Sequence, residues 1–318
     1  MLSHFIKLLR TKRSTPADSE PRATPAPEVE ASLGNRIAEQ GLFVVGAART
    51  GTTILQNALN DSPEIFLLGE PCFHDDPGHA DFGARYNAMH RAWGNQENKS
   101  SYCPAFFETD ASWRAYLHYL AGLYRYVGSK IVINPGDANS TCGRLFDFHC
   151  RHFYRSHYVF TFRNPLDTLM STRGLAELNG DQAVTHTEVL RSYGLVIQLY
   201  IRMLRNLPYV FAIFHDAVDS SSFDSLGAAL GVPLDGAMRY YNRAKVRHYQ
   251  ITDIPETSRP SMREALELYE SFRDQTIAGY ELPQIEQNAG HLDPTHYTAL
   301  GALSRRVQLM LDHLYGKS

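Results

Sequence analysis

Short apolar runs alternate with amphipathic segments through the first two thirds of the chain, and this pattern predicts its secondary structure. Apolar runs of four to six residues are typical of buried strands, and apolar residues at helical spacing are typical of helices that cover a sheet. We predict strands at 42–46, 65–68, 130–133, 158–162 and 209–214. We predict helices at 52–60, 110–126, 165–178 and 187–206, and a further helix around His149 that leads into the strand at 158–162.

This order of elements predicts an α/β fold. Strands that alternate with helices form a parallel sheet with helices on both faces, joined by right-handed crossovers. No convincing strand follows residue 235, and 259–280 and 296–314 have helical patterns, so we expect a mainly helical C-terminal part.

The first 40 residues differ from the rest. Residues 14–35 are rich in Pro, Ala, Ser, Thr and Glu, a composition typical of disorder. We therefore predict a disordered tail at 1–40 and one domain at 41–318. Residues 1–12 are too few to span a membrane. They form either a frayed start without a role or a short basic amphipathic helix in weak contact with a membrane or a partner.

Charge and cysteine content narrow the possible partners. The formal net charge is −3, so nothing in the charge balance indicates nucleic-acid binding. The four cysteines form no C-x-x-C pair, which predicts free thiols in a reducing compartment and hence a cytoplasmic protein. His149, Cys150, His152 and His157 fit no common zinc spacing, so we expect no metal site.

The sequence LFVVGAARTGTT at 42–53 combines a strand, a loop of small residues and a helix start. Amides at a helix N-terminus bind anions, so this segment predicts a phosphate cradle. A loop for ATP or GTP with magnesium would place lysine after its second glycine. Here Thr52 follows Gly51, the positive charge lies on Arg49, and the best later strand ends in Arg163 rather than aspartate. We therefore expect a nucleotide with a short phosphate chain and no metal.

A second motif follows the strand at 158–162. Arg163 ends this strand, Asn164 is a suitable N-cap, and Pro165 suits the first position of the next helix. This placement suits bidentate binding of a phosphate by Arg163. The alternative is a structural arginine that pairs with Asp167.

Together the two motifs resemble those of sulfotransferases that use 3′-phosphoadenosine 5′-phosphosulfate (PAPS). Residues 49–53 are similar to the R-[ST]-G-[ST]-T loop of the tyrosylprotein branch and of many bacterial carbohydrate members. Arg163 and Ser171 are similar in spacing to R-[DN]-P-x-D-x-x-x-S, and a weaker match continues through 210–235. The resemblance covers about residues 41–250 and implies a P-loop-type parallel sheet.

The resemblance also implies site residues and a reaction. The 5′-phosphosulfate would be held by Arg49, Thr50, Gly51, Thr52 and Thr53, with Arg49 neutralising the leaving phosphate. Arg163 and Ser171 would hold the 3′-phosphate. The reaction implied is sulfuryl transfer from PAPS to an acceptor hydroxyl, which leaves 3′-phosphoadenosine 5′-phosphate (PAP).

Sulfuryl transfer requires a base for the acceptor proton, and two residues are candidates. Glu70, in LLGEP, is similar to the G-E phrase that supplies the carboxylate in the tyrosylprotein branch. His74 is the rival, because cytosolic small-molecule members use histidine. Glu70 would otherwise be a loop-capping or salt-bridging residue. Family members often carry lysine just before a proline that follows the third strand. Lys130 lies at the start of the predicted strand 130–133, so we assign it no catalytic role.

Two other regions and two other function classes stay open. Residues 239–248 are basic and aromatic, and either close over the nucleotide or form a solvated surface. Aromatic residues between the second and third strands suit a sugar ring or the protein core: Tyr86, Trp93, Tyr102, Phe106, Phe107, Trp113 and Tyr116. By analogy with soluble bacterial relatives we expect a carbohydrate or glycolipid acceptor. The alternatives are a P-loop kinase-like nucleotide enzyme and a non-catalytic PAP(S)-binding protein.

Overall fold

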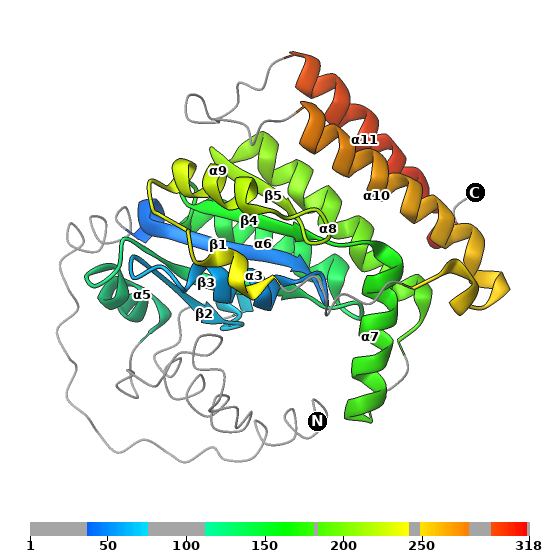
Figure 1. The fold of residues 1–318 in the computed structure, drawn as a ribbon, viewed down its shortest axis with the longest axis horizontal. Helices are drawn as coiled ribbons and strands as arrows, with labels where there is room; N and C mark the ends of the chain where they lie inside the picture. Colours follow the sequence, from blue (N-terminus) through cyan, green and yellow to red (C-terminus); the bar gives the residue numbers. More distant parts are fainter. Residues whose placement is uncertain (1–36, 76–111, 181–183, 242–248, 280–293, 317–318) are drawn as a thin grey trace.

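A computed structural model describes residues 37–75, 112–180, 184–241, 249–279 and 294–316. The described chain forms a five-stranded sheet in which every neighbouring pair of strands is parallel, in the order β2-β3-β1-β4-β5 (Figure 1). The strands are β1 (Gly41–Ala47), β2 (Ile65–Gly69), β3 (Tyr126–Ile133), β4 (His157–Phe162) and β5 (Tyr209–Phe214). The predicted parallel sheet is therefore confirmed.

Helices connect the strands and form the C-terminal part. They are α3 (Thr52–Leu59), α5 (Trp113–Ala121), α6 (Ala138–His152), α7 (Pro165–Asn179), α8 (His186–Asn206), α9 (Ser220–Leu230), α10 (Arg259–Gly279) and α11 (Pro294–Leu314). Short 3-10 turns are η1 (Phe73–Asp75), η2 (Ala237–Tyr240), η4 (Ile251–Asp253) and η5 (Glu256–Ser258). Residues close in sequence fix the start of α8. The Thr185 hydroxyl accepts from the Glu188 amide, and the Glu188 side chain accepts from the Thr185 amide, which forms a capping box.

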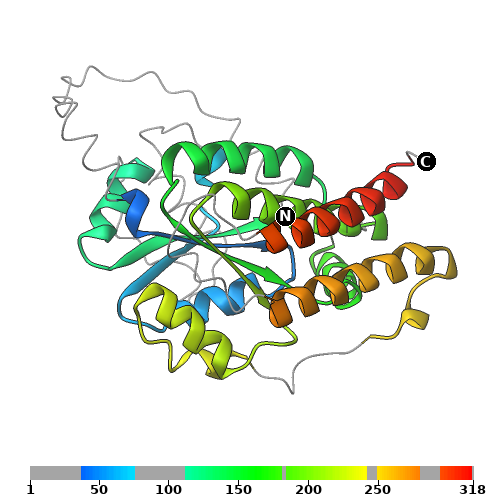
Figure 2. The same cartoon turned by 90° about the horizontal axis from the view of Figure 1, so that it is seen from above.

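Both faces of the sheet are buried, which explains why its strands are almost wholly apolar. Leu42 and Val44 of β1 pack with α3 and α9 on one face. Phe43 and Val45 point to the other face, into a larger core shared with α5, α6, α8, α10 and α11. Figure 2 shows these two layers on opposite sides of the strands. The two C-terminal helices pack beside one another, and α11 lies against α8.

Two predicted boundaries are wrong. The helix predicted at 110–126 ends at Ala121 with Gly122 as its C-cap, and the third strand begins at Tyr126 rather than at residue 130. Lys130 is therefore an interior residue of β3, paired in register with Gly69 of β2 and Val44 of β1. This moves Lys130 from the start of a strand into the buried sheet.

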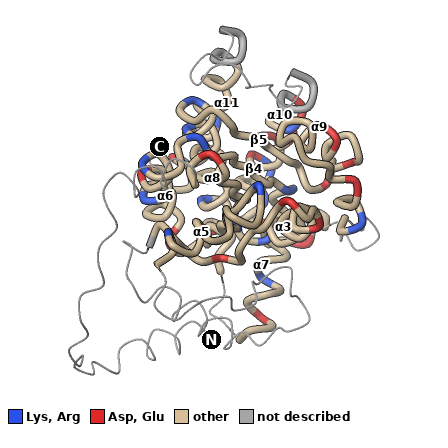
Figure 3. Tube along the Cα trace, turned by 90° about the vertical axis from the view of Figure 1, so that its left-hand side faces the viewer, with Lys and Arg blue, Asp and Glu red and all other residues tan. Residues whose placement is uncertain are grey.

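The remaining predictions about the chain ends concern mostly residues outside the described ranges. Residues 1–36 lie outside them; residues 37–40 are helical, and Ile37 packs into the larger core. Within the described ranges, no helix is both long and apolar enough to cross a membrane. Basic and acidic positions are interspersed over the described chain (Figure 3).

Candidate functional site

Hydrogen bonds of Thr50 fix the loop after β1. The N-cap residue of α3 provides no side-chain hydrogen bond to the first turn of that helix. Thr50 is fully buried, its hydroxyl donates to the Ala47 carbonyl (2.8 Å), and its own carbonyl accepts from the Thr161 hydroxyl (2.9 Å). The N-cap of α3 is Gly51, at φ 101°, which has no side chain to cap the first-turn amides. This geometry fits the predicted phosphate cradle, because the helix N-terminus stays open to an anion.

The second predicted motif lies at the end of the adjacent strand β4. Asn164 caps α7 by accepting from the amides of Leu166 (2.9 Å) and Asp167 (3.3 Å). Arg163 lies 3.8 Å from Asp167, so the structural pairing exists but is long. The side chain of Arg163 is 15% exposed, and its buried Nε has no hydrogen-bond partner among the described residues. This N–H of the guanidinium is therefore left without an acceptor among the described residues.

One hydrogen bond joins the two motifs across 122 positions of sequence. Arg49 Nε donates to Ser171 Oγ (3.1 Å), so the loop after β1 contacts α7 directly. The pKa of Arg49 is lowered, first by burial and second by the positive charge of Arg163. Two cations thus lie close together at this edge of the sheet, where the carboxyl ends of parallel strands form ligand sites.

On the other side of the loop, the first candidate base is paired with a lysine. Glu70 follows β2, and its Oε1 lies 2.8 Å from Lys130 Nζ. The same Nζ donates to the hydroxyl of Thr53 in the first turn of α3 (2.8 Å). Lys130 is 2% exposed and the Glu70 side chain 28% exposed, so a buried cation supports a carboxylate that solvent can reach.

Backbone strain accompanies these groups. Arg49 (φ 69°), Glu70 (φ 38°) and Cys72 (φ 50°) all have left-handed backbone, which is uncommon for residues other than glycine. Arg49 follows β1, and Glu70 and Cys72 follow β2, two parallel strands that lie on either side of β3. Such strain gathers at functional sites because surrounding contacts must hold it. Two of these three residues, Arg49 and Glu70, are the predicted catalytic residues.

Comparison with models of known protein families identifies the family of this chain. The sequence model described as "Sulfotransferase family" matches residues 41–210, more than half of the 318-residue chain. The chain belongs to the sulfotransferase family. The match covers the loop, Glu70, Lys130, Arg163 and Ser171, and it ends just inside β5.

Solved structures with similarity to this sulfotransferase also include members of that class. The sulfotransferase domain of the Synechococcus PCC 7002 olefin synthase is 14% identical, with coverage of 83% of this chain and 92% of that chain and a TM-score of 0.46. A sulfotransferase from Alicyclobacillus acidocaldarius is 18% identical, with coverage of 77% and 98% and a TM-score of 0.40. No curated protein matches the chain.

The rival base lies in a different setting from Glu70. His74 belongs to η1, which packs against α6. The pKa of His149 on α6 is held well below its usual value, mainly by burial and further by the charges of His74 and His152. His74 therefore lies within electrostatic reach of α6, whereas Glu70 is bonded toward Lys130 and α3.

Sequence reasoning missed two residues of this site. The signal for Lys130 was a charged residue in an otherwise apolar stretch, YVGSKIVI, where burial requires a partner. His215 follows β5 directly and gave no signal of its own. We define the Lys130 end of the site as Thr53, Glu70 and Lys130, and the Arg163 end as Arg49, Arg163, Ser171 and His215.

Several other sequence predictions have a structural outcome. His149 Nδ1 lies 3.0 Å from the Tyr158 hydroxyl, which donates to the Phe153 carbonyl. Among the described residues no group of three His, Cys, Asp or Glu side chains is arranged to hold a metal. Trp113 and Tyr116 are core residues at 3% exposure each, and the other aromatic candidates lie outside the described ranges.

The basic and aromatic segment 239–248 is described only at its first three residues. Arg239 forms an ion pair with Asp61, whose carboxylate also accepts from the Tyr240 hydroxyl (3.2 Å). The Tyr241 ring packs against His215 with their centroids 5.3 Å apart. The described start of this segment thus lies against α3 and the Arg163 end.

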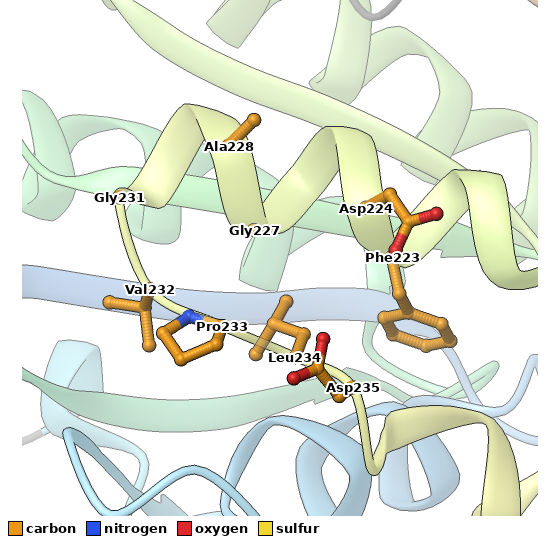
Figure 4. Close-up of a pocket in the computed structure, with 9 residues that line it drawn as sticks. All are labelled: Phe223, Asp224, Gly227, Ala228, Gly231, Val232, Pro233, Leu234 and Asp235. Carbon is orange, nitrogen blue, oxygen red and sulfur yellow. The ribbon is translucent and has the colours of Figure 1, made fainter.

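A cavity of about 350 Å³ lies elsewhere, under the end of α9 (Figure 4). It is lined by Phe223, Asp224, Gly227, Ala228, Gly231, Val232, Pro233, Leu234 and Asp235. The Gly231 carbonyl accepts from Arg125, which directly precedes β3. This end of the cavity therefore lies at the amino ends of the strands, opposite the loop and Arg163.

Proposed function

We propose that this sulfotransferase uses PAPS as its donor and transfers the sulfuryl group to a hydroxyl of a carbohydrate or glycolipid acceptor. One observation carries the proposal: the Arg49–Ser171 hydrogen bond brings the two predicted phosphate motifs together at one edge of the sheet. A nucleotide with phosphates at both its 5′ and 3′ positions matches two neighbouring anion sites. PAPS has this arrangement, and ATP does not.

The charges of the Arg163 end support a phosphate ligand. Arg49 and Arg163 lie close enough for one to lower the pKa of the other, and Asp167 is 3.8 Å from Arg163. Bringing in a phosphate would neutralise this charge and give the buried Arg163 Nε an acceptor. We assign Arg163 and Ser171 to the 3′-phosphate, and residues 49–53 to the 5′-phosphosulfate.

The Lys130 end supports the transfer step. PAPS supplies the sulfuryl group and leaves as PAP. Glu70 takes the proton of the acceptor hydroxyl while that oxygen bonds to sulfur and the bond from sulfur to the phosphate oxygen breaks. Lys130 positions Glu70 against Thr53 through two contacts of 2.8 Å. Arg49 and the first amides of α3 stabilise the negative charge that builds on the leaving phosphate.

A kinase-like activity has less support. The two strands that flank β1 are followed by Asn134 and Arg163, not by an aspartate that would hold magnesium. The carbohydrate or glycolipid acceptor rests on the resemblance alone, because Trp113 and Tyr116 are used in the core. We place the enzyme in the cytoplasm, since Cys72, Cys142 and Cys150 are free thiols.

Calorimetry with PAP in the absence of metal tests the donor. PAP should bind the wild-type protein, and Arg163→Ala should weaken binding by about 2–4 kcal/mol because a phosphate loses its charged partner. The matched control is Arg155→Ala, which removes an exposed arginine paired with Glu39 and should leave PAP affinity unchanged. Much tighter binding of ATP with magnesium than of PAP would refute the proposal.

Turnover of labelled PAPS separates an enzyme from a non-catalytic binding protein. The assay is a screen of sugar and glycolipid acceptors with the full chain, followed by detection of the labelled product. Transfer to a hydroxyl of either class supports the proposal. PAP binding without transfer to any acceptor would support the non-catalytic alternative, and transfer only to a different class would correct the acceptor.

A further inference from the structure

His215 lies between the two phosphate motifs, although neither motif contains it. It directly follows β5, and its backbone N–H donates to the carbonyl of Phe162, the last residue of β4 (2.7 Å). Arg163 is the next residue along that chain. The sheet therefore holds His215 beside Arg163 by a main-chain bond that does not depend on the side chain of either residue.

The imidazole packs against the loop after β1. A Cβ placed on Gly51 would lie 2.6 Å from His215 Nδ1, so the ring occupies the space that a larger residue at position 51 would need. A second contact of the imidazole is the Tyr241 ring, with centroids 5.3 Å apart. The ring of His215 thus contacts both the phosphate cradle and Tyr241, the C-cap residue of η2.

This packing indicates which nitrogen of the neutral His215 imidazole carries the proton. Nδ1 is buried, has no hydrogen-bond partner among the described residues, and faces Gly51. An N–H directed at a Cα–H group would lose water and gain no acceptor, whereas a bare nitrogen there makes a weak C–H contact. The proton therefore belongs on Nε2. Because the residue as a whole is only partly buried, Nε2–H is the donor available to a ligand.

The surrounding charges keep the ring neutral. Burial lowers the pKa of His215 to about 4, the charge of Arg163 adds to this, and Asp216 opposes it. Asp216 is itself engaged by the Tyr269 hydroxyl and by Arg273 at 3.8 Å. The other titratable neighbour is Tyr241, whose pKa is raised by burial, so it is uncharged. Near neutral pH His215 is therefore a neutral N–H donor beside a cation.

We propose that His215 binds the donor nucleotide, with Nε2–H donating to an oxygen of a phosphate group bound between Gly51 and Arg163. The inference rests on the proposed function, since it names a further binding residue of the same site. A neutral donor adds a hydrogen bond to the phosphate without adding a third positive charge to Arg49 and Arg163. It would therefore strengthen phosphate binding without further repulsion in the empty protein.

Calorimetric titration of PAP tests this assignment. His215→Phe keeps an aromatic ring against Gly51 and Tyr241 but removes the donor, and it should weaken PAP binding about 10-fold or more, as expected for a hydrogen bond to a charged group. His215→Gln keeps an N–H donor and should recover part of the affinity. Adenosine 5′-phosphate and adenosine 3′-phosphate identify the phosphate involved, because only the mononucleotide that carries it should lose affinity in His215→Phe.

His157→Phe is the matched control. It also replaces a buried histidine with a pKa of about 4. His157 is the first residue of β4, at the end of the strand away from Arg163, and its ring stacks on Tyr209 (centroids 4.4 Å apart). PAP affinity should be unchanged in this variant, and melting curves should show that all variants fold. Wild-type affinity in His215→Phe would overturn the assignment while leaving the proposed function intact. Failure of the wild-type protein to bind PAP would overturn both.

Discussion

The two ends of the site handle charge in opposite ways. At the Lys130 end, one buried cation is paired with a carboxylate and a hydroxyl, each at 2.8 Å. At the Arg163 end, two arginines lie near one another, and the acid beside Arg163 is 3.8 Å away. The first end is complete in the protein itself. The second has more positive charge than its close neighbours neutralise.

This difference separates a group that must be positioned from a group that must be bound. A carboxylate that acts as a base needs a fixed geometry before the acceptor arrives, and the Lys130 pair provides it. Uncompensated cations destabilise the empty protein, but they favour an anion when it arrives. We therefore expect substitutions at the Lys130 end to change rate and stability. Substitutions at the Arg163 end should change affinity, and at Arg49 also turnover, with little effect on stability.

The largest expected effect is on rate, at Glu70. Glu70→Gln keeps the shape of the side chain and removes its basicity, so kcat should fall about 10²–10⁴-fold, the range for loss of a general base. PAP affinity should hardly change, because Glu70 does not belong to the Arg163 end. The measurement is steady-state kinetics with labelled PAPS, together with PAP calorimetry.

The rival base supplies the control for this experiment. His74→Gln should lower kcat only slightly, since His74 lies toward α6. Loss of turnover in His74→Gln with near-normal turnover in Glu70→Gln would reverse the two roles. A melting curve of each variant is needed, because unfolding of Glu70→Gln would point to a salt-bridging role alone.

The next effect is on stability, at Lys130. Lys130→Met removes a cation that is 2% exposed and leaves Glu70 without its partner, so the free energy of unfolding should fall by about 2–4 kcal/mol. Urea unfolding measures the loss. The double variant Lys130→Met with Glu70→Gln should recover part of it, since no unpaired carboxylate remains.

Arg49→Ala makes the same type of change at the Arg163 end and sharpens the contrast. It removes one of two neighbouring cations, so the free energy of unfolding should change by less than about 1 kcal/mol. Turnover should still fall about 10²-fold because a charged contact to the leaving phosphate is lost, and Arg49→Lys should restore part of it. A large loss of stability in Arg49→Ala would show that the two ends do not differ as described.

The sequence predicts the parts of this site that depend on local order. The loop from Arg49 to Thr53 follows from an apolar strand that ends in glycine, and the place of Arg163 follows from a strand, an N-cap and a proline in succession. The structure places both motifs at the carboxyl ends of the neighbouring strands β1 and β4. These elements are specified by neighbours in sequence, so their positions could be predicted without knowledge of the packing.

Lys130 and His215 could not be predicted in this way, because long-range contacts give them their roles. Gly128 and Ser129 interrupt the apolar run of β3, so the sequence pattern predicts a strand that begins only at Lys130. Its lysine is tolerated in the sheet only because Glu70 and Thr53, both distant in sequence, meet its Nζ. His215 likewise has a role only because β4 and β5 are neighbours and Gly51 leaves room for its ring.

The smallest expected effect is a pH dependence of stability that involves the Arg163 end. Burial holds the pKa values of His215 and His157 near 4 in the folded protein, while unfolded histidines titrate near 6.5. Between these values the unfolded chain binds more protons, so the free energy of unfolding falls as the pH drops from about 6.5 toward 4. The loss is about 1.4 kcal/mol per pH unit for each histidine, hence about 2 kcal/mol each at pH 5.

Variants at the two histidines separate their contributions. Urea unfolding between pH 5 and 7 should show a shallower slope in His215→Gln and in His157→Phe than in the wild-type protein, because each removes one proton that only the unfolded chain binds. Saturating PAP should reduce the slope assigned to His215, since a phosphate beside Arg163 offsets the charge that disfavours a protonated ring, and should leave the slope assigned to His157 unchanged. An identical response of both histidines to PAP would mean that His215 does not sense the anion, and that the Arg163 end is limited to its two arginines and Ser171.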